Sequence, residues 1–189
     1  MDNMRKIEVP FPSCSHLYDE VPIGKYKILV TAYNDFDLPR PKINQSYFLS
    51  SEWINFLQPI EVFGKPIDTV SSYPRLISNP AIMVHWPDYG VLTYKQIDWL
   101  VNKIIVDLEC GLVVETGCTG GHGRTGTLLA CLAGKLLGLS ATEAIQHIRK
   151  VYCMFAVEKE SQIELIAEYL QSPIPSPADV HTHEFRYYR

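Results

Sequence analysis

The stretch that decides the fold is GLVVETGCTGGHGRTG, residues 111–126. It begins with a short apolar run, which predicts a buried strand, and continues through five glycines between positions 117 and 126. The apolar residues that follow, as far as Gly138, predict a buried helix. A glycine-rich turn between a strand and a helix binds anions, because its backbone N–H groups point into the turn and the helix end adds partial positive charge.

Three side chains of this loop carry the predicted chemistry. Cys118 lies at the mouth of the loop, where N–H dipoles favour a thiolate, so we interpret it as a nucleophile. The planar guanidinium of Arg124 suits two oxygens of a phosphoryl group. We expect the hydroxyl of Thr125 to hydrogen-bond the sulfur. The loop ends in Gly-Arg-Thr, whereas a Walker-type nucleotide loop ends in Gly-Lys-Ser or Gly-Lys-Thr.

The run from Cys118 to Gly126 resembles the C-x5-R-[ST]-G signature of the cysteine-dependent protein tyrosine and dual-specificity phosphatases. Two further segments resemble that superfamily in the same order. Residues 86–90, WPDYG, resemble the loop that carries the general acid, and residues 157–162, VEKESQ, resemble the segment that carries a water-orienting glutamine. The resemblance covers roughly residues 81–170, and the first third of the chain matches only vaguely.

The resemblance implies a mechanism and the residues that perform it. Cys118 would attack phosphorus, Asp88 would protonate the leaving oxygen, and Gln162 would orient the water that hydrolyses the phosphocysteine. We expect no cofactor and no metal, since the histidines and cysteines show no ligand spacing along the sequence. The residues implied to bind the phosphate are Thr119, Gly120, Gly121, His122, Gly123 and Arg124.

Two positions of the loop need a separate interpretation. The family usually has a histidine directly before the nucleophile, and this chain has Gly117. We therefore expect the Cys118 thiol to ionise less readily than in the family. We expect the side chain of His122 to project outward, either as an exposed loop residue or as a positive charge that meets an acidic substrate.

The expected function is phosphomonoester hydrolysis on phosphotyrosine in proteins or, as a dual-specificity enzyme, also on phosphoserine and phosphothreonine. Three alternatives remain open. In the first, the chain is a phosphatase whose substrate is a phosphoinositide, a nucleotide or an RNA 5′ phosphate. In the second it is a phosphate-binding pseudophosphatase, and in the third it is a sulfurtransferase or arsenate reductase. The net charge of −4 disfavours nucleic acid as a partner. The segment from Asn44 to Tyr47 is a candidate for tyrosine recognition.

The composition is that of an ordinary globular protein, with 47% hydrophobic and 20% charged residues among 189. No apolar run of 18 residues predicts a membrane span, and the first residues lack the apolar core of a secretory signal. Five cysteines without a CxxC pair predict reduced thiols and a cytoplasmic protein.

The predicted fold is α/β (α+β), a single domain with a central mixed sheet flanked by helices. We place the catalytic domain at residues 1–172 and a proline-rich, loosely packed tail at residues 173–189. Apolar runs predict strands at 27–33, 81–86 and 111–116. Capping boxes and helical spacing predict helices at about 93–108, 125–138, 140–150 and 158–171. Residues 34–51 are predicted to form a long loop, followed by a short helix at about 52–57.

Overall fold

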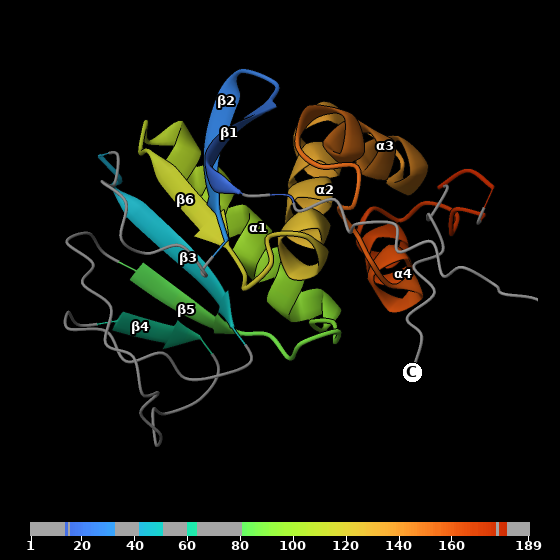
Figure 1. The fold of residues 1–189 in the computed structure, drawn as a ribbon, viewed down its shortest axis with the longest axis horizontal. Coiled ribbons are helices and arrows are strands. Elements are labelled where there is room, and N and C mark those ends of the chain that lie inside the picture. Colours follow the sequence, from blue (N-terminus) through green and yellow to red (C-terminus); the bar gives the residue numbers. More distant parts are fainter. Residues whose placement is uncertain are drawn as a thin grey trace, which may run out of the picture.

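The computed structural model describes residues 14, 16–32, 42–50, 60–63, 81–176 and 178–180. Within these residues it contains one six-stranded sheet and four helices (Figure 1). The strands are β1 (Leu17–Ile23), β2 (Tyr26–Thr31), β3 (Gln45–Ser50), β4 (Ile60–Phe63), β5 (Ala81–His85) and β6 (Val114–Gly117). The helices are α1 (Tyr94–Glu109), α2 (Gly123–Leu137), α3 (Ala141–Val151) and α4 (Glu160–Tyr169).

The sheet is mixed, as predicted, with strand order β1-β2-β6-β3-β5-β4. The pairing of β1 with β2 is antiparallel, and the other neighbouring strands pair in parallel. Because β5, β3 and β6 run in parallel, their carboxyl ends meet at one edge of the sheet. The loops that follow β5 and β6 therefore start at the same edge of the sheet, on either side of β3, and carry the WPDYG and CTGGHGRTG segments.

The prediction of a loop over residues 34–51 is wrong for its last part, because β3 is an inner strand of the sheet. Its sequence, QSYFLS, contains two buried serines and so lacks a continuous apolar pattern. Ser46 donates a hydrogen bond of 2.6 Å to the carboxylate of the buried Glu115 in β6, so a polar pair replaces an apolar contact here. The predicted helix at 52–57 lies outside the described residues.

The predicted helices are confirmed, with small changes at their ends. Capping boxes begin α1 at Thr93 and α3 at Ser140, as the sequence indicated. Helix α2 ends at Gly138, which has a left-handed φ of 68°. Helix α4 is shorter than predicted, since it begins at Glu160 and ends at Tyr169.

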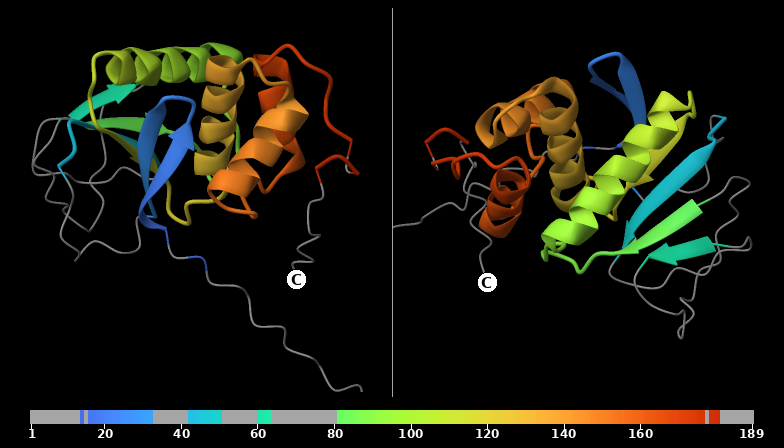
Figure 2. Two further views of the ribbon diagram at one scale, coloured as in Figure 1. Left: turned by 90° about the horizontal axis from the view of Figure 1, so that it is seen from above. Right: turned by 180° about the vertical axis from the view of Figure 1, so that it is seen from behind.

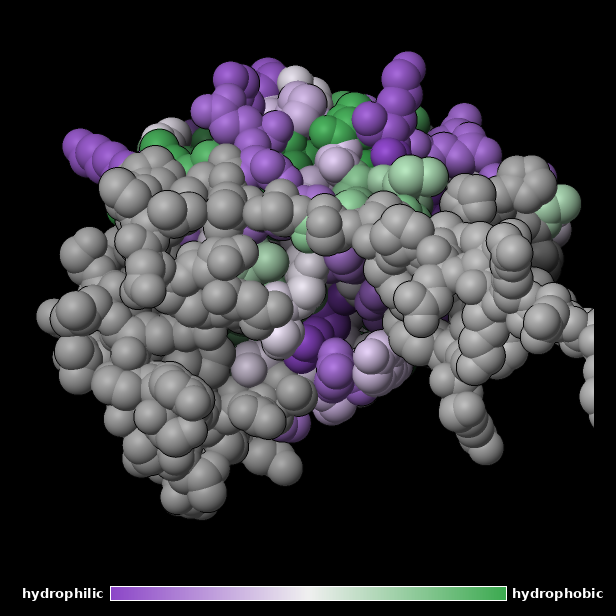
Figure 3. All heavy atoms as spheres, in the orientation of Figure 1, coloured by the Kyte–Doolittle hydropathy of each residue, from purple (hydrophilic) through white to green (hydrophobic). Residues whose placement is uncertain are grey.

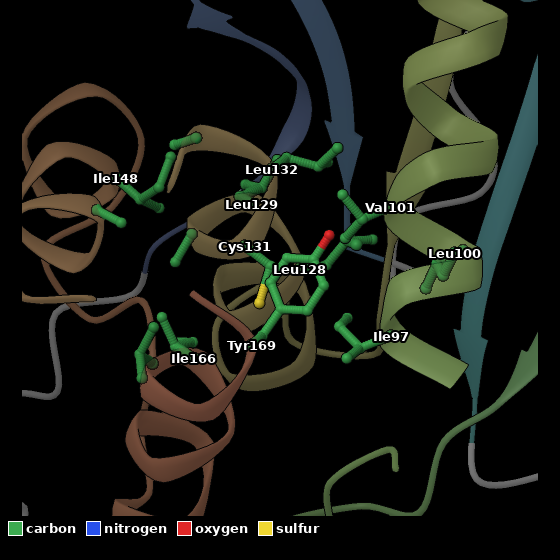
Figure 4. Close-up of a cluster of buried hydrophobic side chains, with 14 of the residues drawn as sticks. Ile97, Leu100, Val101, Leu128, Leu129, Cys131, Leu132, Ile148, Ile166 and Tyr169 are labelled. Atoms are coloured by element: carbon green, nitrogen blue, oxygen red, sulfur yellow. The ribbon is translucent and has the colours of Figure 1, made fainter. Parts of the chain in front are cut away.

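Helix α2 forms the centre of the core. Figures 1 and 2 show α1 along the back of the sheet beside α2, and α3 and α4 packed on the other side of α2. Because α2 is surrounded in this way, its residues from Gly123 to Gly134 are buried on all sides, as the nearly uniform apolar sequence predicted, and Leu137 at its end is exposed. Side chains that meet around α2 in Figure 4 are Leu128, Cys131 and Leu132 from α2, Ile97 and Val101 from α1, Ile148 from α3, and Ile166 and Tyr169 from α4.

The packed part of the chain extends beyond the boundary predicted at residue 172. Val180 is only 1% exposed and belongs to the hydrophobic core, and Gln146 donates a hydrogen bond to the carbonyl of Asp179. The side chain of Val180 is therefore packed against the domain, whereas most of the other described residues after position 172 are exposed. Among the described residues, no single helix is long and apolar enough to cross a membrane. Helices α2 and α3 together have the length and composition of a span, but the pair is bent by 115°.

Candidate active site

Two loops from the same sheet edge form the site. The loop after β5 is attached to β3 by a hydrogen bond of 2.9 Å from the Trp86 N–H to the Ser50 carbonyl. The loop after β6 turns directly into α2, so its backbone N–H groups lie at the N-terminus of a buried helix. A pocket of about 170 Å³ lies between these loops and the start of α4. Figure 3 shows hydrophilic residues gathered at the centre of this face of the molecule.

The pocket brings together most of the residues predicted from the sequence. Cys118 lies in it and is only 3% exposed, so the sulfur is reached only through the pocket. Of the predicted site residues, Gly121 and Thr125 are not part of the pocket wall. The residues that line it are Asp88, Tyr89, Cys118, Thr119, Gly120, His122, Gly123, Arg124, Glu158 and Gln162.

Arg124 links the two loops. Its guanidinium donates hydrogen bonds of 3.1 Å to the Trp86 carbonyl and 3.3 Å to the Thr119 hydroxyl. The same group forms an ion pair of 3.1 Å with Asp88. Arg124 is only 4% exposed, and its guanidinium contacts three partners. These contacts fix its orientation, as is required for a guanidinium that binds two phosphoryl oxygens.

Asp88 is carried by a tight turn with its own internal support. The buried Trp86 ring donates a hydrogen bond of 2.9 Å to the Gly90 carbonyl, and the Gly90 N–H donates one of 3.0 Å to the Pro87 carbonyl. Tyr89 has a positive φ of 56°, and its ring lies under the Lys159 ammonium at 4.8 Å. The turn thus presents the Asp88 carboxylate, which is 56% exposed, at the open side of the pocket.

Sequence comparisons give relatives without an assigned activity. No protein-family model matches the chain. The uncharacterized proteins MJECL20 and MJ0215 of Methanocaldococcus jannaschii are 41% and 40% identical to it over 103 and 102 residues. Each alignment covers 54% of this chain, and the chain spans 66% and 61% of the lengths of the two relatives.

Solved structures show what the fold is. The active form of Tk-PTP matches 85% of this chain and 98% of its own, with a TM-score of 0.51 and 19% identity. A kinase associated phosphatase matches 90% and 98% with a TM-score of 0.58 and 12% identity, and a variant of human DUSP28 matches 81% and 97% with a TM-score of 0.56 and 14% identity. The chain has the fold of the cysteine-dependent protein tyrosine and dual-specificity phosphatases. The expected fold class is thus confirmed.

The glutamine predicted from the sequence resemblance, Gln162, reaches the pocket from α4. Gln162 is only 1% exposed, and its side-chain oxygen accepts hydrogen bonds from the N–H groups of Glu158 and Lys159, at 2.8 and 3.2 Å. Its amide nitrogen lies against Gly123, where a Cβ atom would come within 2.9 Å of it. The oxygen is therefore fixed by the backbone. The NH₂ group faces the loop between β6 and α2, which is predicted to bind phosphate and is called the phosphate loop below.

Glu158 is a site residue that the sequence interpretation missed. Its carboxylate lies against the first residue of α2, since a Cβ atom on Gly123 would be 2.4 Å from it, and it accepts a hydrogen bond from the Gly123 N–H. Burial raises the pKa of Glu158, and nearby Asp88 adds to this, while Lys159 and Arg124 oppose it. An acidic residue beside lysine in a polar segment is typical of a solvated surface, so nothing in the sequence marked this role.

Close backbone packing explains two glycines of the phosphate loop. Gly121 has a φ of 77°, and a Cβ atom there would lie 2.9 Å from both the His16 ring and the Tyr152 hydroxyl. A Cβ atom on Gly126 would lie 2.7 Å from the Val157 backbone nitrogen. The hydroxyl of Thr125 is buried without a hydrogen-bond partner in the described part of the chain, so the expected bond to the Cys118 sulfur is not formed here.

The sequence predicted that the side chain of His122 projects outward, but in the structure it packs against neighbouring rings. Its ring packs edge-on against the rings of His16 and Phe155, with centroids 5.0 and 6.1 Å away, and its Nε2 atom is buried. Burial lowers the pKa of His122, and the neighbouring His16 lowers it further. The imidazole lines one side of the pocket but is held there by ring packing, and its lowered pKa disfavours a positive charge.

Gly117 and the segment from Asn44 to Tyr47 both belong to the sheet. Gly117 is the last residue of β6 and pairs with Phe48 of β3. Ser46 and Tyr47 are fully buried, so the interpretation of this segment as a tyrosine-recognition motif is wrong. The weaker ionisation expected for Cys118 because of Gly117 stays a prediction.

Proposed function

We propose that the protein hydrolyses phosphomonoesters through a phosphocysteine intermediate and acts on phosphotyrosine in proteins. The observation that carries the proposal is the pocket itself. A cysteine, an arginine, an aspartate and a glutamine from three separate segments line one small cavity at a helix N-terminus. The phosphatase fold supports this assignment.

In the first step the Cys118 thiolate attacks phosphorus. A sulfur–phosphorus bond forms, the ester bond breaks, and the leaving oxygen takes the proton of Asp88. Arg124 and the loop N–H groups stabilise the charge on the equatorial oxygens. The guanidinium of Arg124 is already held in place by Trp86 and Thr119 before substrate binds. Phosphate bound to Arg124 competes with the Asp88–Arg124 ion pair, so Asp88 is released to hold the proton that it donates to the leaving oxygen.

In the second step water attacks the phosphocysteine. Asp88 accepts the proton of the water, the sulfur–phosphorus bond breaks, and inorganic phosphate and the thiolate are released. Gln162 is suited to orient this water, because its oxygen is held by two backbone N–H groups and its NH₂ group faces Gly123. No other described residue of the pocket wall has a side-chain amide.

The charge around the pocket favours a substrate with a single phosphoryl group. Among the described residues that line it, Arg124 carries the one fixed positive charge, and Asp88 and Glu158 carry carboxylates. A second phosphate beside the first would meet these carboxylates, which disfavours polyphosphorylated inositides and nucleotides. The half-exposed ring of Tyr89 stands at the rim, where it packs against an aromatic leaving group.

The test is phosphate release from p-nitrophenyl phosphate, followed by a panel of substrates. Cys118→Ser should abolish turnover, and phosphotyrosine peptides should be hydrolysed faster than phosphoinositides, nucleotides or RNA 5′ phosphate. Binding of phosphate without turnover by the unaltered protein would show a pseudophosphatase instead. Turnover that consumes a thiol reductant and requires arsenate would show an arsenate reductase.

A further inference from the structure

Four metal-ligating side chains meet beside the loop that carries Cys118, and one of them, His122, also lines the catalytic pocket. Cys14 and His16 come from the segment before β1, His122 from the loop itself, and Cys153 from the residues after α3. Their ligand atoms all lie within 4.8 Å of one another. No pair of them is close in sequence except Cys14 and His16, so the fold alone creates this cluster.

Each histidine of the cluster has a buried ring nitrogen that could bind a metal ion. The Nε2 atoms of His16 and His122 are shielded from solvent and have no hydrogen-bond partner in the described part of the chain. A buried polar atom without a partner costs free energy, so two such atoms on rings whose centroids are 5.0 Å apart point to a missing partner. His16 Nδ1 carries the proton that it shares with Asp19, so its Nε2 has a lone pair, and His122 Nε2 has one in the Nδ1–H tautomer. A partner that accepts both lone pairs is a cation.

The two sulfurs are spaced as ligands of one ion. Cys14 Sγ and Cys153 Sγ are 3.8 Å apart. Two thiolates on a tetrahedral zinc ion lie about 3.8 Å apart, because each Zn–S bond is about 2.3 Å long. A disulfide requires about 2.05 Å, so the observed spacing fits shared coordination better than a covalent bond.

The ring of His16 is already oriented for coordination. Its Nδ1 atom is 2.7 Å from the carboxylate of Asp19, which leaves Nε2 directed at the cluster. A carboxylate on the outer nitrogen of a histidine ligand is the usual arrangement at zinc sites, where it fixes the tautomer and orients the ring. The ring also packs on Tyr152 at 4.6 Å between centroids, and the Tyr152 hydroxyl donates a hydrogen bond to the Gly121 carbonyl.

We propose that Cys14, His16, His122 and Cys153 bind one zinc ion in a closed, tetrahedral Cys₂His₂ site that fastens the phosphate loop to the segment before β1. Two sulfur and two nitrogen ligands select zinc over the hard cations magnesium and calcium. The thiols bind as thiolates, so two protons are released when the ion enters. The site is structural, because all four positions are taken by side chains and none is left for water or substrate.

The location gives the ion a role at the neighbouring pocket. His122 lies between Gly121 and Gly123, two loop residues with little side-chain support of their own. Coordination of the imidazole would hold this part of the loop in place from behind.

The experiment measures zinc binding directly and does not depend on phosphatase activity. The full chain carries Cys118→Ser, so that the catalytic thiol cannot bind metal, and any affinity tag is removed. Metal-free protein is then dialysed against zinc. We expect about one tightly bound zinc ion per chain, at least about tenfold less in Cys14→Ser and Cys153→Ser, and about tenfold to 100-fold weaker binding in Asp19→Asn. Cys110→Ser, an exposed thiol outside the cluster, is the matched control and should bind like the parent.

A second readout needs no ligand variant and so does not depend on their folding. Cobalt added to the Cys118→Ser protein should give the intense visible and thiolate-to-metal absorption bands of a tetrahedral site with two sulfurs. The proposal is overturned if these bands are absent, if zinc does not bind stoichiometrically, or if the ligand variants bind as much as the control. A Cys14–Cys153 disulfide in protein purified without oxidant or reductant would also overturn it.

Discussion

Asp88 and Arg124 lie 3.1 Å apart, although Asp88 belongs to the loop after β5 and Arg124 to the first turn of α2, with α1 and β6 between them in the sequence. The contact places the proposed acid beside the proposed phosphate-binding group before any substrate is present. It also means that Asp88 is paired with a nitrogen of the guanidinium that a bound phosphoryl group would need.

This contact predicts opposite effects of Asp88→Asn on binding and on catalysis. The kcat for an alkyl phosphate should fall about 10²–10⁴-fold, because the leaving oxygen loses its proton donor. The loss should be smaller for p-nitrophenyl phosphate, whose leaving group needs less protonation. KM should stay the same or fall, since a charge that competes for Arg124 is removed. Steady-state kinetics on both substrates measure the split.

Asp98→Asn is the matched control for that variant. Asp98 is a half-exposed carboxylate in α1 that pairs with Lys135 at 3.2 Å, outside the pocket. It should leave both kinetic constants unchanged. An equal loss on alkyl and aryl substrates in Asp88→Asn would argue that Asp88 only positions the loop.

The raised pKa of Glu158 predicts a pH dependence of anion binding. As pH falls through that pKa, which lies above the ordinary 4.5, the carboxylate becomes neutral and the Gly123 N–H becomes available to a ligand. Sulfate, which stays doubly charged in this range, should therefore bind the Cys118→Ser protein more tightly at lower pH. Glu158→Gln should bind sulfate about three- to tenfold more tightly at pH 7 and show a weaker rise on acidification.

Calorimetric titrations between pH 4 and 7 measure this effect. Glu160→Gln is the control, because Glu160 is exposed in the first turn of α4 and does not line the pocket. The interpretation of Glu158 fails if the two glutamine variants bind sulfate alike at every pH.

Gly126 should be the glycine of the loop that stability depends on most directly. In Gly126→Ala the new methyl group meets the Val157 nitrogen at 2.7 Å and the Ala156 Cβ at 2.8 Å, and backbone atoms cannot move away without shifting the start of the α4 segment. We expect a loss of about 1–3 kcal/mol in the free energy of unfolding. Urea denaturation measures it.

Gly120→Ala provides the comparison for stability alone. A Cβ atom at Gly120 has only the His122 ring at 3.9 Å as a neighbour, which is an ordinary contact. Its free energy of unfolding should stay within about 0.5 kcal/mol of the parent. If both variants lose the same free energy of unfolding, the close approach of α2 to residues 156–157 is not the reason why position 126 requires glycine.

The features that the sequence predicted correctly are those encoded by neighbouring residues. Capping boxes at Thr93 and Ser140 and the strand–loop–helix pattern around Cys118 are local signals, and each is present in the structure. Strand β3 was missed because its stability comes from distant partners. The buried Ser46 is polar in the sequence and becomes a core residue only when Glu115 lies beside it.

The same reasoning explains the errors around the site. His122 was expected to be exposed because its flanking glycines suggest an open loop, whereas rings from residues more than 30 positions away, or from before β1, cover it. Glu158 was passed over because its carboxylate acquires its role only from contact with Gly123. The cluster of Cys14, His16, His122 and Cys153 was not predicted, because its residues come from distant parts of the sequence that only the fold brings together.

The central claim is that Cys118 carries the phosphoryl group during turnover. A rapid-quench experiment with Gln162→Ala, in which water attack should be slowed, tests it most directly. We predict a burst of p-nitrophenol close to one equivalent of protein, and the added mass of one phosphoryl group on the peptide that contains Cys118. Turnover without a burst and without modified Cys118 peptide, in protein whose activity Cys118→Ser does not abolish, would contradict the account.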